Sequence, residues 1–225
     1  MSNILKRPGV AVGLALAVAA IVFLESTRAP WAPFFYGGAL VTLLIPLAAR
    51  TALRDDKRVK GTPWLAMAAA LVGLLIVDAL AMGPVLDAAG KNLGILPLSA
   101  ALSALLAKAA ASQHLSLDGA SSIYAAFYVV WAPIAEELFY RGYLRQSLSP
   151  RLGEPMTAVI SSALFALRHV PHLMYLAVVP WATIAVWTAS VFAGGLILYW
   201  LVRRTGLLWP AIVVHLIDNV AGLMM

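Results

Sequence analysis

The sequence predicts an all-α protein, a polytopic transmembrane bundle of about seven or eight helices. Two observations on composition predict this class. Hydrophobic residues make up 62% of the 225 residues and charged residues only 12%, and the mean hydropathy is +0.89. Soluble domains are roughly 25% charged, so a chain with so few charges cannot cover a water-facing surface. We expect a single membrane domain over residues 1–225.

The distribution of basic residues is the third observation. The formal net charge is +6 and the isoelectric point is near 9.8. The positive residues lie in short clusters at the ends of apolar runs, which is the positive-inside pattern of membrane proteins and not a nucleic-acid-binding stripe. We therefore expect membrane lipid as a partner and no nucleic acid. The chain has no cysteine, which excludes disulfides, zinc–thiolate sites and a cysteine nucleophile.

The apolar runs predict the helices in order. The first, about 8–24, follows Lys6 and Arg7. A signal peptide is the alternative for this run, but no clear small-x-small cleavage site follows it, which favours a retained helix. The further runs cover about 30–49, 62–82, 120–148, 155–170, 176–202 and 207–224. Each can cross a hydrocarbon core of about 30 Å at 1.5 Å per helical residue, and 155–170 only just does so.

The basic loops predict the orientation of these runs. Residues 6–7, 50–61, 141–151 and 203–204 are expected to share the cytoplasmic side. This works if 93–111, a segment rich in Ala and Ser, is interfacial or re-entrant and does not cross. The prediction is then seven spans, with the N-terminus inside and the C-terminus outside. If 93–111 spans, the N-terminus is outside or one basic loop is misplaced. The Ala-rich composition favours a prokaryotic plasma membrane.

Polar side chains inside the apolar runs are the informative ones, because a charge in a membrane is costly without a partner or a function. They are Asp78, Glu136, Glu137, Arg141, Arg168, His169, His215, Asp218 and Asn219. Glu137 and Arg141 are four residues apart, in the favourable order for an ion pair that stabilises the helix. Glu136 is rotated about 100° from Glu137. It is therefore predicted to face a different neighbour.

Three of these residues have plainer expected roles. Arg168 is expected to reach the membrane surface with its long side chain or to pair locally. Asp218 lies three residues after His215 and either tunes that imidazole or lines a polar cavity. Asp78 is expected to pair with a basic group or to make a packing hydrogen bond.

Four polar residues are predicted to lie at a similar depth in the membrane. Measured from the cytoplasmic end of each helix at about 1.5 Å per residue, Glu136 lies roughly 18 Å deep, His169 roughly 21 Å, His215 roughly 12 Å and Asn219 roughly 18 Å. Three helices distant in sequence thus bring a carboxylate, two imidazoles and an amide into one layer. A shared site explains this convergence better than four separate structural roles.

The residue types in this layer are suited to hydrolysis. A carboxylate in a low-dielectric pocket can act as a general base on water. Nearby imidazole and amide groups can donate hydrogen bonds to a developing oxyanion, so no covalent nucleophile is needed. The alternative is a divalent metal such as zinc held by Glu136, His169 and His215, with Asn or water completing the shell. The H-E-x-x-H motif of zinc proteases is absent.

Four motifs resemble those of the CAAX protease and bacteriocin-processing family of intramembrane glutamic-type endopeptidases. EELFYR (136–141) resembles the E-E-x-x-x-R signature of the family, and FALRH (165–169) resembles its F-x-x-x-H motif. HLIDN (215–219) is similar to H-x-x-x-N, and FAGG (192–195) is similar to a weaker aromatic-glycine motif. The motifs occur in the family's order over about 120–225, roughly half of the chain.

The resemblance implies a membrane endopeptidase whose site lies within the bilayer, with 120–225 as the half that carries the catalytic motifs. Glu136 would be the base that activates water, and His169 would belong to the catalytic cluster. His215 and Asn219 would stabilise the oxyanion or orient the water. The residues that would support the site are Glu137, Arg141 and Phe165. No obligatory cofactor is expected, with a divalent metal such as zinc as the alternative.

The resemblance also implies classes of substrate. These are prenylated CAAX ends, C-terminal sorting or anchoring segments, and leader peptides of small secreted peptides. Two other functions stay open. One is a non-catalytic membrane scaffold or bacteriocin-immunity protein that keeps the polar cluster for binding. The other is a transporter whose Glu and His side chains relay protons, although the broken helices in repeated halves that are typical of transporters are not seen in the sequence.

Overall fold

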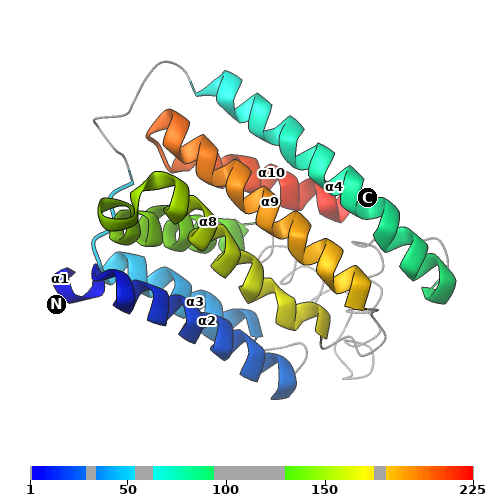
Figure 1. Cartoon of the computed structure of the whole chain (residues 1–225), viewed down its shortest axis with the longest axis horizontal. Helices are drawn as coiled ribbons and strands as arrows, with labels where there is room; N and C mark the ends of the chain where they lie inside the picture. Colours follow the sequence, from blue (N-terminus) through cyan, green and yellow to red (C-terminus); the bar gives the residue numbers. More distant parts are fainter. Residues whose placement is uncertain (1, 29–33, 54–62, 94–129, 175–180, 225) are drawn as a thin grey trace.

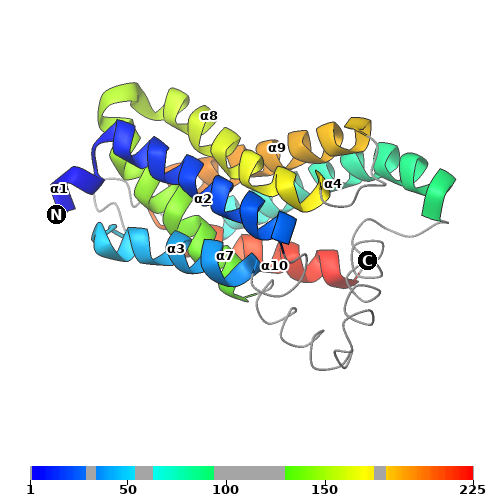
Figure 2. The same ribbon diagram turned by 90° about the horizontal axis from the view of Figure 1, so that it is seen from below.

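The structure is a computed structural model that describes residues 2–28, 34–53, 63–93, 130–174 and 181–224. Over these ranges every regular element is a helix and none is a β-strand, so the expectation of an all-α protein is confirmed for this part of the chain. The helices lie side by side in both Figure 1 and Figure 2. The expected number of seven or eight helices stays a prediction.

The first half of the chain contributes the helices α1 (Ser2–Leu5), α2 (Pro8–Arg28), α3 (Phe34–Ala48) and α4 (Trp64–Leu93). The last three correspond to the first three apolar runs. Helix α4 continues well past the expected end at 82. The expectation placed the end where hydropathy falls, but most of the residues that follow are still compatible with a helix. The segment 93–111, apart from the last residue of α4, lies outside the described residues.

The second half contributes α7 (Ala132–Glu136), the π-helix η2 (Glu137–Leu144), α8 (Arg145–Met174), α9 (Trp181–Thr205) and α10 (Trp209–Met224). Helix α8 is interrupted at Gly153, whose φ of 72° and ψ of 165° are not helical. A positive φ suits glycine, which has no Cβ. The chain turns back on itself here, as Figure 1 shows. This is the basic turn that the sequence predicts between the runs 120–148 and 155–170.

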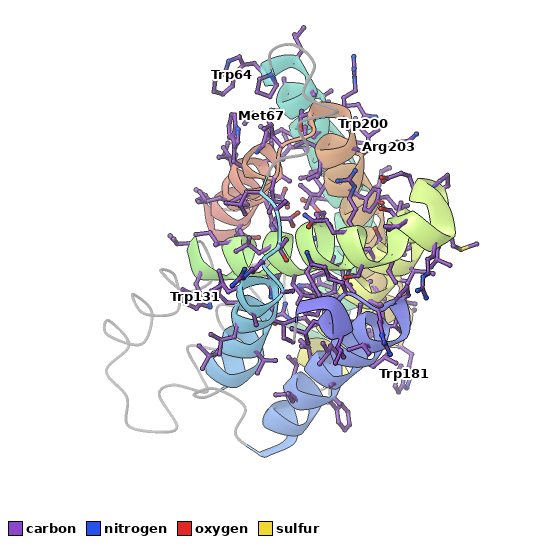
Figure 3. All side chains as sticks on the ribbon, turned by 90° about the vertical axis from the view of Figure 1, so that its left-hand side faces the viewer. Trp64, Met67, Trp131, Trp181, Trp200 and Arg203 are labelled. Atoms are coloured by element: carbon purple, nitrogen blue, oxygen red, sulfur yellow. The ribbon has the colours of Figure 1, made fainter. Side chains whose placement is uncertain are left out.

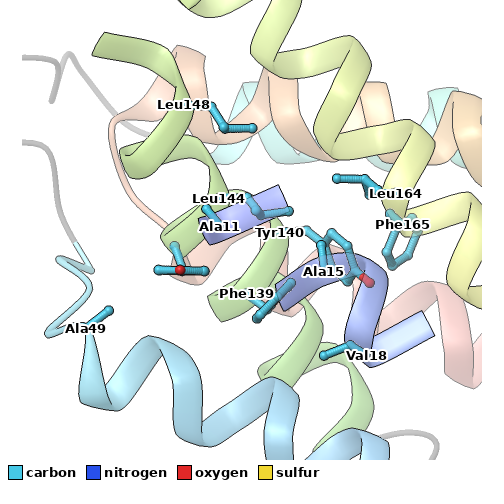
Figure 4. Packing of buried hydrophobic residues seen from close by; sticks show 11 residues of the cluster. Ala11, Ala15, Val18, Ala49, Phe139, Tyr140, Leu144, Leu148, Leu164 and Phe165 are labelled. Atoms are coloured by element: carbon cyan, nitrogen blue, oxygen red, sulfur yellow. The ribbon is translucent and has the colours of Figure 1, made fainter. Parts of the chain in front are cut away.

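Two apolar clusters hold the helices together. The first joins α2, α3, η2 and α8 and includes Val18, Tyr140, Leu144 and Phe165, which Figure 4 shows packed together. The second joins α4, α9 and α10 and includes Leu74, Leu198 and Val214. Helix α8 packs against both α2 and α9 and so connects the two halves of the molecule. The polar residues of the motifs lie where these two clusters meet.

The outer surface is apolar along the helices. The stretches Trp64–Ala81 and Ile184–Thr205 are each long and apolar enough to cross a membrane, and Pro8–Phe23 and Trp209–Val220 are shorter apolar stretches. Large apolar side chains face outward, among them Leu65, Leu80 and Trp181. Figure 3 shows Trp64, Trp131, Trp181 and Trp200 at the periphery of the molecule. An exterior of this kind suits lipid better than water.

Candidate active site

The motif EELFYR starts at the last residue of α7 and continues through the π-helix η2. The spacing of the motif predicts an ordinary α-helix here, and the π-helix differs from that expectation. π-turns are rare, and they occur frequently at functional sites. All three charged side chains of the motif are buried: Glu136 is 3% exposed, Glu137 0% and Arg141 1%. Glu137 and Arg141 still lie on one face of the helix, as their direct contact shows.

Glu137 is the centre of a closed hydrogen-bonded group. Its Oε1 accepts a hydrogen bond from Arg141 Nη1 at 2.8 Å and another from His215 Nδ1 at 2.9 Å. Arg141 also donates from Nη2 to the backbone oxygen of Gly195 at 3.3 Å, and its Cζ lies 4.2 Å from the centre of the Phe165 ring. The predicted ion pair between Glu137 and Arg141 is confirmed. The contact between Glu137 and His215 is additional and holds the imidazole in one orientation.

The glycines of FAGG make room for this group. A Cβ at Gly195 would lie 3.0 Å from Ser162 Cβ and 3.2 Å from Arg141 Nη2. A Cβ at Gly194 would lie 3.2 Å from Leu74 Cδ2. Both glycines therefore allow close packing around α9, and Gly195 in addition lets the guanidinium reach the backbone.

Glu136 has a different environment from Glu137. Its Oε1 accepts a hydrogen bond from Arg168 Nη1, in a buried ion pair between α7 and α8. Its Oε2 lies 3.9 Å from His169 Nε2 and 3.9 Å from His215 Nε2. The structure thus brings together the carboxylate and the two imidazoles that the sequence predicts to share a layer. Asn219 is buried on α10, one turn beyond His215.

The hydrogen bonds of the two imidazoles define which nitrogen carries the proton. His169 Nδ1 lies 2.7 Å from the backbone oxygen of Phe165, and His215 Nδ1 lies 2.9 Å from Glu137 Oε1. A carbonyl and a carboxylate are acceptors only, so both Nδ1 atoms are donors. In its neutral form each ring then has a lone pair on Nε2. Each Nε2 atom lies 3.9 Å from Glu136 Oε2, so the neutral imidazoles place two lone pairs around this carboxylate oxygen.

Phe165 lies at the centre of the site. Its ring makes edge contacts with the rings of Tyr140 at 5.2 Å, His169 at 4.6 Å and His215 at 6.0 Å, between centroids. The tilted ring of Trp187 lies 5.7 Å from His169 on its other side. The ring of Phe165 therefore lies between the guanidinium of Arg141 and the two imidazoles, and its supporting role stays a prediction.

The role of Arg168 differs from the expectation. Arg168 is expected from the sequence to reach the membrane surface or to pair locally, but its side chain is buried and pairs with Glu136 on another helix. Pairing the acidic and basic residues of the apolar runs could have predicted a partner for Arg168. Once Glu137 and Arg141 neutralise each other, Arg168 is the base left at this depth in the second half of the chain, with Glu136 and Asp218 as the acids that could pair with it.

The two aspartates of the apolar runs lie together at the contact of α4 and α10. The carboxyl groups of Asp78 and Asp218 lie close enough to interact, and the expected pairing of Asp78 with a basic group or through a packing hydrogen bond stays a prediction. Asp218 is also close enough to His215 to interact with its charge. Both alternatives that the sequence leaves open for Asp218 are compatible with this position.

The family comparison covers the part of the chain that contains this site. Residues 118–221 match the family model described as Type II CAAX prenyl endopeptidase Rce1-like. No curated protein and no solved structure shows a significant match to the chain. The matched residues include EELFYR, FALRH and HLIDN, and they nearly coincide with the range of the resemblance. This segment, a little under half of the chain, is similar to the Rce1-like CAAX proteases, a membrane-embedded protease family and the one that the motifs resemble.

Proposed function

We propose that this protein is an intramembrane endopeptidase that hydrolyses a peptide bond near the C-terminus of a membrane-associated substrate, with Glu136 as the general base. The matched family supports a CAAX-type segment as the substrate class, with C-terminal sorting segments and leader peptides as further candidates. One observation supports the chemistry above all. Glu136 Oε2 faces His169 Nε2 and His215 Nε2 at 3.9 Å each, deep inside the protein.

The distances from Glu136 Oε2 to His169 Nε2 and His215 Nε2 suit a bridging water molecule. A separation of 3.9 Å is too long for a direct hydrogen bond, but a water beside that line can lie about 2.8 Å from both atoms. Such a water donates one hydrogen to Glu136 Oε2 and the other to the lone pair on one Nε2 atom. Its own lone pairs then point away from the carboxylate and are available to attack a carbonyl carbon.

Hydrolysis then needs three movements of protons and electrons. Glu136 takes a proton from the water as the water oxygen bonds to the carbonyl carbon, and the C=O π electrons move to the carbonyl oxygen. As these electrons return, the C–N bond breaks. Glu136 delivers the proton to the leaving nitrogen, so the products are a carboxyl terminus and an amine. Arg168 holds Oε1 throughout, which leaves Oε2 as the reacting oxygen.

The residues around Glu136 keep the reacting groups in place. The hydrogen bond from His215 Nδ1 to Glu137 fixes the direction of His215 Nε2, and the hydrogen bond to Phe165 does the same for His169. Asn219 is assigned to the orientation of water or substrate, because it is buried one turn from His215. A base held within about one hydrogen bond of its water is what general-base catalysis requires.

The residue types at this site suit a zinc ion, but the distances between their ligand atoms do not. Two imidazole nitrogens and a carboxylate oxygen are zinc ligands, and bound zinc supplies a water of lowered pKa. Ligands about 2.1 Å from one tetrahedral ion lie about 3.4 Å apart, closer than the 3.9 Å found here. Among the described residues, no group of three or more His, Cys, Asp or Glu side chains is arranged to hold a metal.

The proposal places the protein in a membrane as a multi-pass protein, with a prokaryotic plasma membrane as its expected location. The two apolar stretches long enough to span and the outward-facing leucine and tryptophan side chains support this placement. A site deep among the helices would then receive its substrate as a membrane-anchored peptide. A prenyl group attached close to the scissile bond suits this route, because it holds the peptide at the lipid surface.

The proposed function is tested with the purified full chain in lipid nanodiscs. It is incubated with a farnesylated peptide ending in a CAAX sequence, the same peptide without the lipid, and a leader-type peptide, and the fragments are identified by mass spectrometry. Glu136→Gln keeps the size of the side chain and an oxygen for Arg168 but removes the base. We expect cleavage at one bond by the wild type and a rate at least about 100-fold lower for Glu136→Gln.

Two results would contradict the proposal. Unchanged cleavage by Glu136→Gln, with a similar unfolding midpoint, would exclude Glu136 as the base. Failure of the wild type to cut any peptide would favour the scaffold or immunity function instead.

A chelator separates the two ways of activating water. After dialysis against a strong chelator, we expect the wild type to cleave the farnesylated peptide at an unchanged rate. Loss of cleavage that added zinc restores would assign a metal to Glu136, His169 and His215, in a closer arrangement than the one described.

A further inference from the structure

The proposed reaction requires a hydrogen-bond donor that the two imidazoles do not provide. As water attacks, negative charge develops on the carbonyl oxygen of the substrate, and donors aimed at that oxygen are a major source of rate. His169 and His215 both use the proton on Nδ1 for other acceptors, and both have a lone pair on Nε2 when neutral. The amide of Asn219, buried one turn beyond His215, is one candidate donor, and any further donor must come from another side chain.

Tyr140 has a buried hydroxyl that the fold does not use. The side chain lies four residues after Glu136, one turn further along the same helix, and is 0% exposed. Within the described residues its hydroxyl has no hydrogen-bond partner. Burial of an unpaired hydroxyl is unfavourable, so such groups are rare in folded proteins and call for an explanation.

The surroundings of Tyr140 place it at the site. Its ring makes an edge contact with Phe165 at 5.2 Å between centroids, and Figure 4 shows the two rings side by side. Helical side chains lean toward the N-terminal end of their helix, which directs Tyr140 back over the turn of Glu136. The charges of Arg168, Glu136 and Arg141 all act on its phenol.

Tyr143 lies in the same helix and has a hydroxyl with a structural role. It lies three residues after Tyr140 and is also buried. Its hydroxyl donates a hydrogen bond to the backbone oxygen of Leu5 at 2.5 Å, which ties the π-helix to the N-terminal helices. The two tyrosines thus share an element and a degree of burial but differ in whether the hydroxyl is paired.

We propose that the Tyr140 hydroxyl is a catalytic hydrogen-bond donor, which donates to the carbonyl oxygen of the scissile peptide bond as that oxygen becomes negative. The phenol keeps its proton and forms no covalent bond. In the free enzyme the hydroxyl is left without a partner, and it gains its acceptor only when substrate is bound. This inference rests on the proposed peptidase function.

The test compares Tyr140→Phe with Tyr143→Phe. Each change removes one oxygen and leaves the aromatic ring contacts in place. The farnesylated CAAX peptide is used to measure kcat and KM, and thermal unfolding of the same samples is followed in nanodiscs. For Tyr140→Phe we expect kcat to fall about 100-fold or more, with KM changed less than about two-fold. The unfolding midpoint should stay the same or rise, because an unpaired buried hydroxyl is removed. Tyr143→Phe should lower the midpoint and leave kcat unchanged.

Each remaining outcome counts against the inference in a recognisable way. Wild-type kcat for Tyr140→Phe would overturn the role of Tyr140 and leave the peptidase function intact. A lower midpoint for Tyr140→Phe, matching that of Tyr143→Phe, would assign the hydroxyl a structural partner and also overturn it. If the wild type cuts no peptide, the proposed function fails first and the inference falls with it.

Discussion

Glu136 and Glu137 are adjacent and equally buried, but their carboxylates have opposite environments. Glu137 Oε1 has two nitrogen donors at 2.8 and 2.9 Å, whereas the imidazole nitrogens nearest to Glu136 Oε2 lie at 3.9 Å. Glu137 Oε1 thus has two donors while Glu137 Oε2 is buried without a hydrogen-bond partner among the described residues, and neither imidazole lies within hydrogen-bond distance of Glu136 Oε2. The one-residue offset decides this, because it directs Glu137 to Arg141 and to His215 on α10, and Glu136 to Arg168 and His169 on α8.

This difference shows how a membrane protein can use charge in two ways. We call Glu137, Arg141 and His215 with the Gly195 carbonyl the closed side, and Glu136, Arg168 and His169 the open side. Each contains one Glu–Arg ion pair, so the site as a whole is close to neutral. On the closed side the pair fixes helices relative to one another. On the open side the pair leaves one carboxylate oxygen available for chemistry.

The largest expected effect is the loss of the closed pair. Arg141→Leu leaves Glu137 as a buried carboxylate without its guanidinium, and it also removes the bond to the Gly195 carbonyl. Breaking a buried ion pair on one side typically costs about 3–5 kcal/mol. We expect poor recovery of folded protein and a sharply lower unfolding midpoint in detergent. Arg151→Leu, at an exposed position on the turn of α8, is the control and should change stability by less than about 0.5 kcal/mol.

Arg168→Leu breaks the corresponding pair on the open side. Glu136 borders the gap at the imidazoles, so water can compensate part of its charge, and we expect a smaller loss of stability, about 1–3 kcal/mol. Cleavage should nevertheless be lost, because Oε1 is no longer held. Unfolding midpoints and cleavage rates of the two variants are compared in the same detergent. Equal losses of stability for Arg141→Leu and Arg168→Leu would show that the two sides do not differ as argued.

Alanine substitutions at the adjacent glycines of α9, Gly194 and Gly195, test the closed side alone. In Gly195→Ala the new methyl group meets Ser162 and Arg141 Nη2 at 3.0–3.2 Å, so it displaces the guanidinium from the Gly195 carbonyl. Overpacking of this kind costs about 1–3 kcal/mol. Gly194→Ala meets only the end of the Leu74 side chain at 3.2 Å, which can move, and should cost less than about 1 kcal/mol. Chemical unfolding measures both, and the reverse order would contradict the closed packing described for Gly195.

Much of the site was predictable because it depends on local spacing. The i, i+4 spacing of Glu137 and Arg141 predicts their ion pair, and the pair is confirmed. Helix length and periodicity predict a common depth for Glu136, His169 and His215, and these side chains do meet. The roles assigned to these residues and to Asn219 stay predictions until variants are assayed.

The features of the site that the sequence did not predict depend on contacts between helices. The π-helix arises in tertiary packing, and no residue of EELFYR distinguishes it from an α-helix. The partner of Arg168 depends on how α8 lies against α7. The unpaired hydroxyl of Tyr140 and the lone pairs on the two Nε2 atoms follow only from atomic positions. In the first half, hydropathy locates α2, α3 and α4 but not the end of α4, because hydropathy measures lipid compatibility and not helix length.

The smallest expected effect concerns Phe165, whose ring touches both sides. Arg141 Cζ of the closed side lies 4.2 Å from the centre of its ring, and the His169 ring of the open side makes an edge contact with it at 4.6 Å between centroids. Phe165→Leu keeps most of the apolar volume but loses the cation–π contact, which is worth about 0.5–2 kcal/mol. We expect a stability loss of about 1 kcal/mol and a cleavage rate about ten-fold lower, because the His169 ring loses its support.

Phe139→Leu is the matched control for Phe165. Phe139 is equally buried, but its ring contacts Tyr140 and Tyr143 and neither imidazole. It should therefore lose a similar amount of stability without the loss of rate. If Phe139→Leu slows cleavage as much as Phe165→Leu does, the rate depends on general packing of the π-helix. In that case the ring of Phe165 does not connect the closed side to the open side, and the two carboxylates act independently of it.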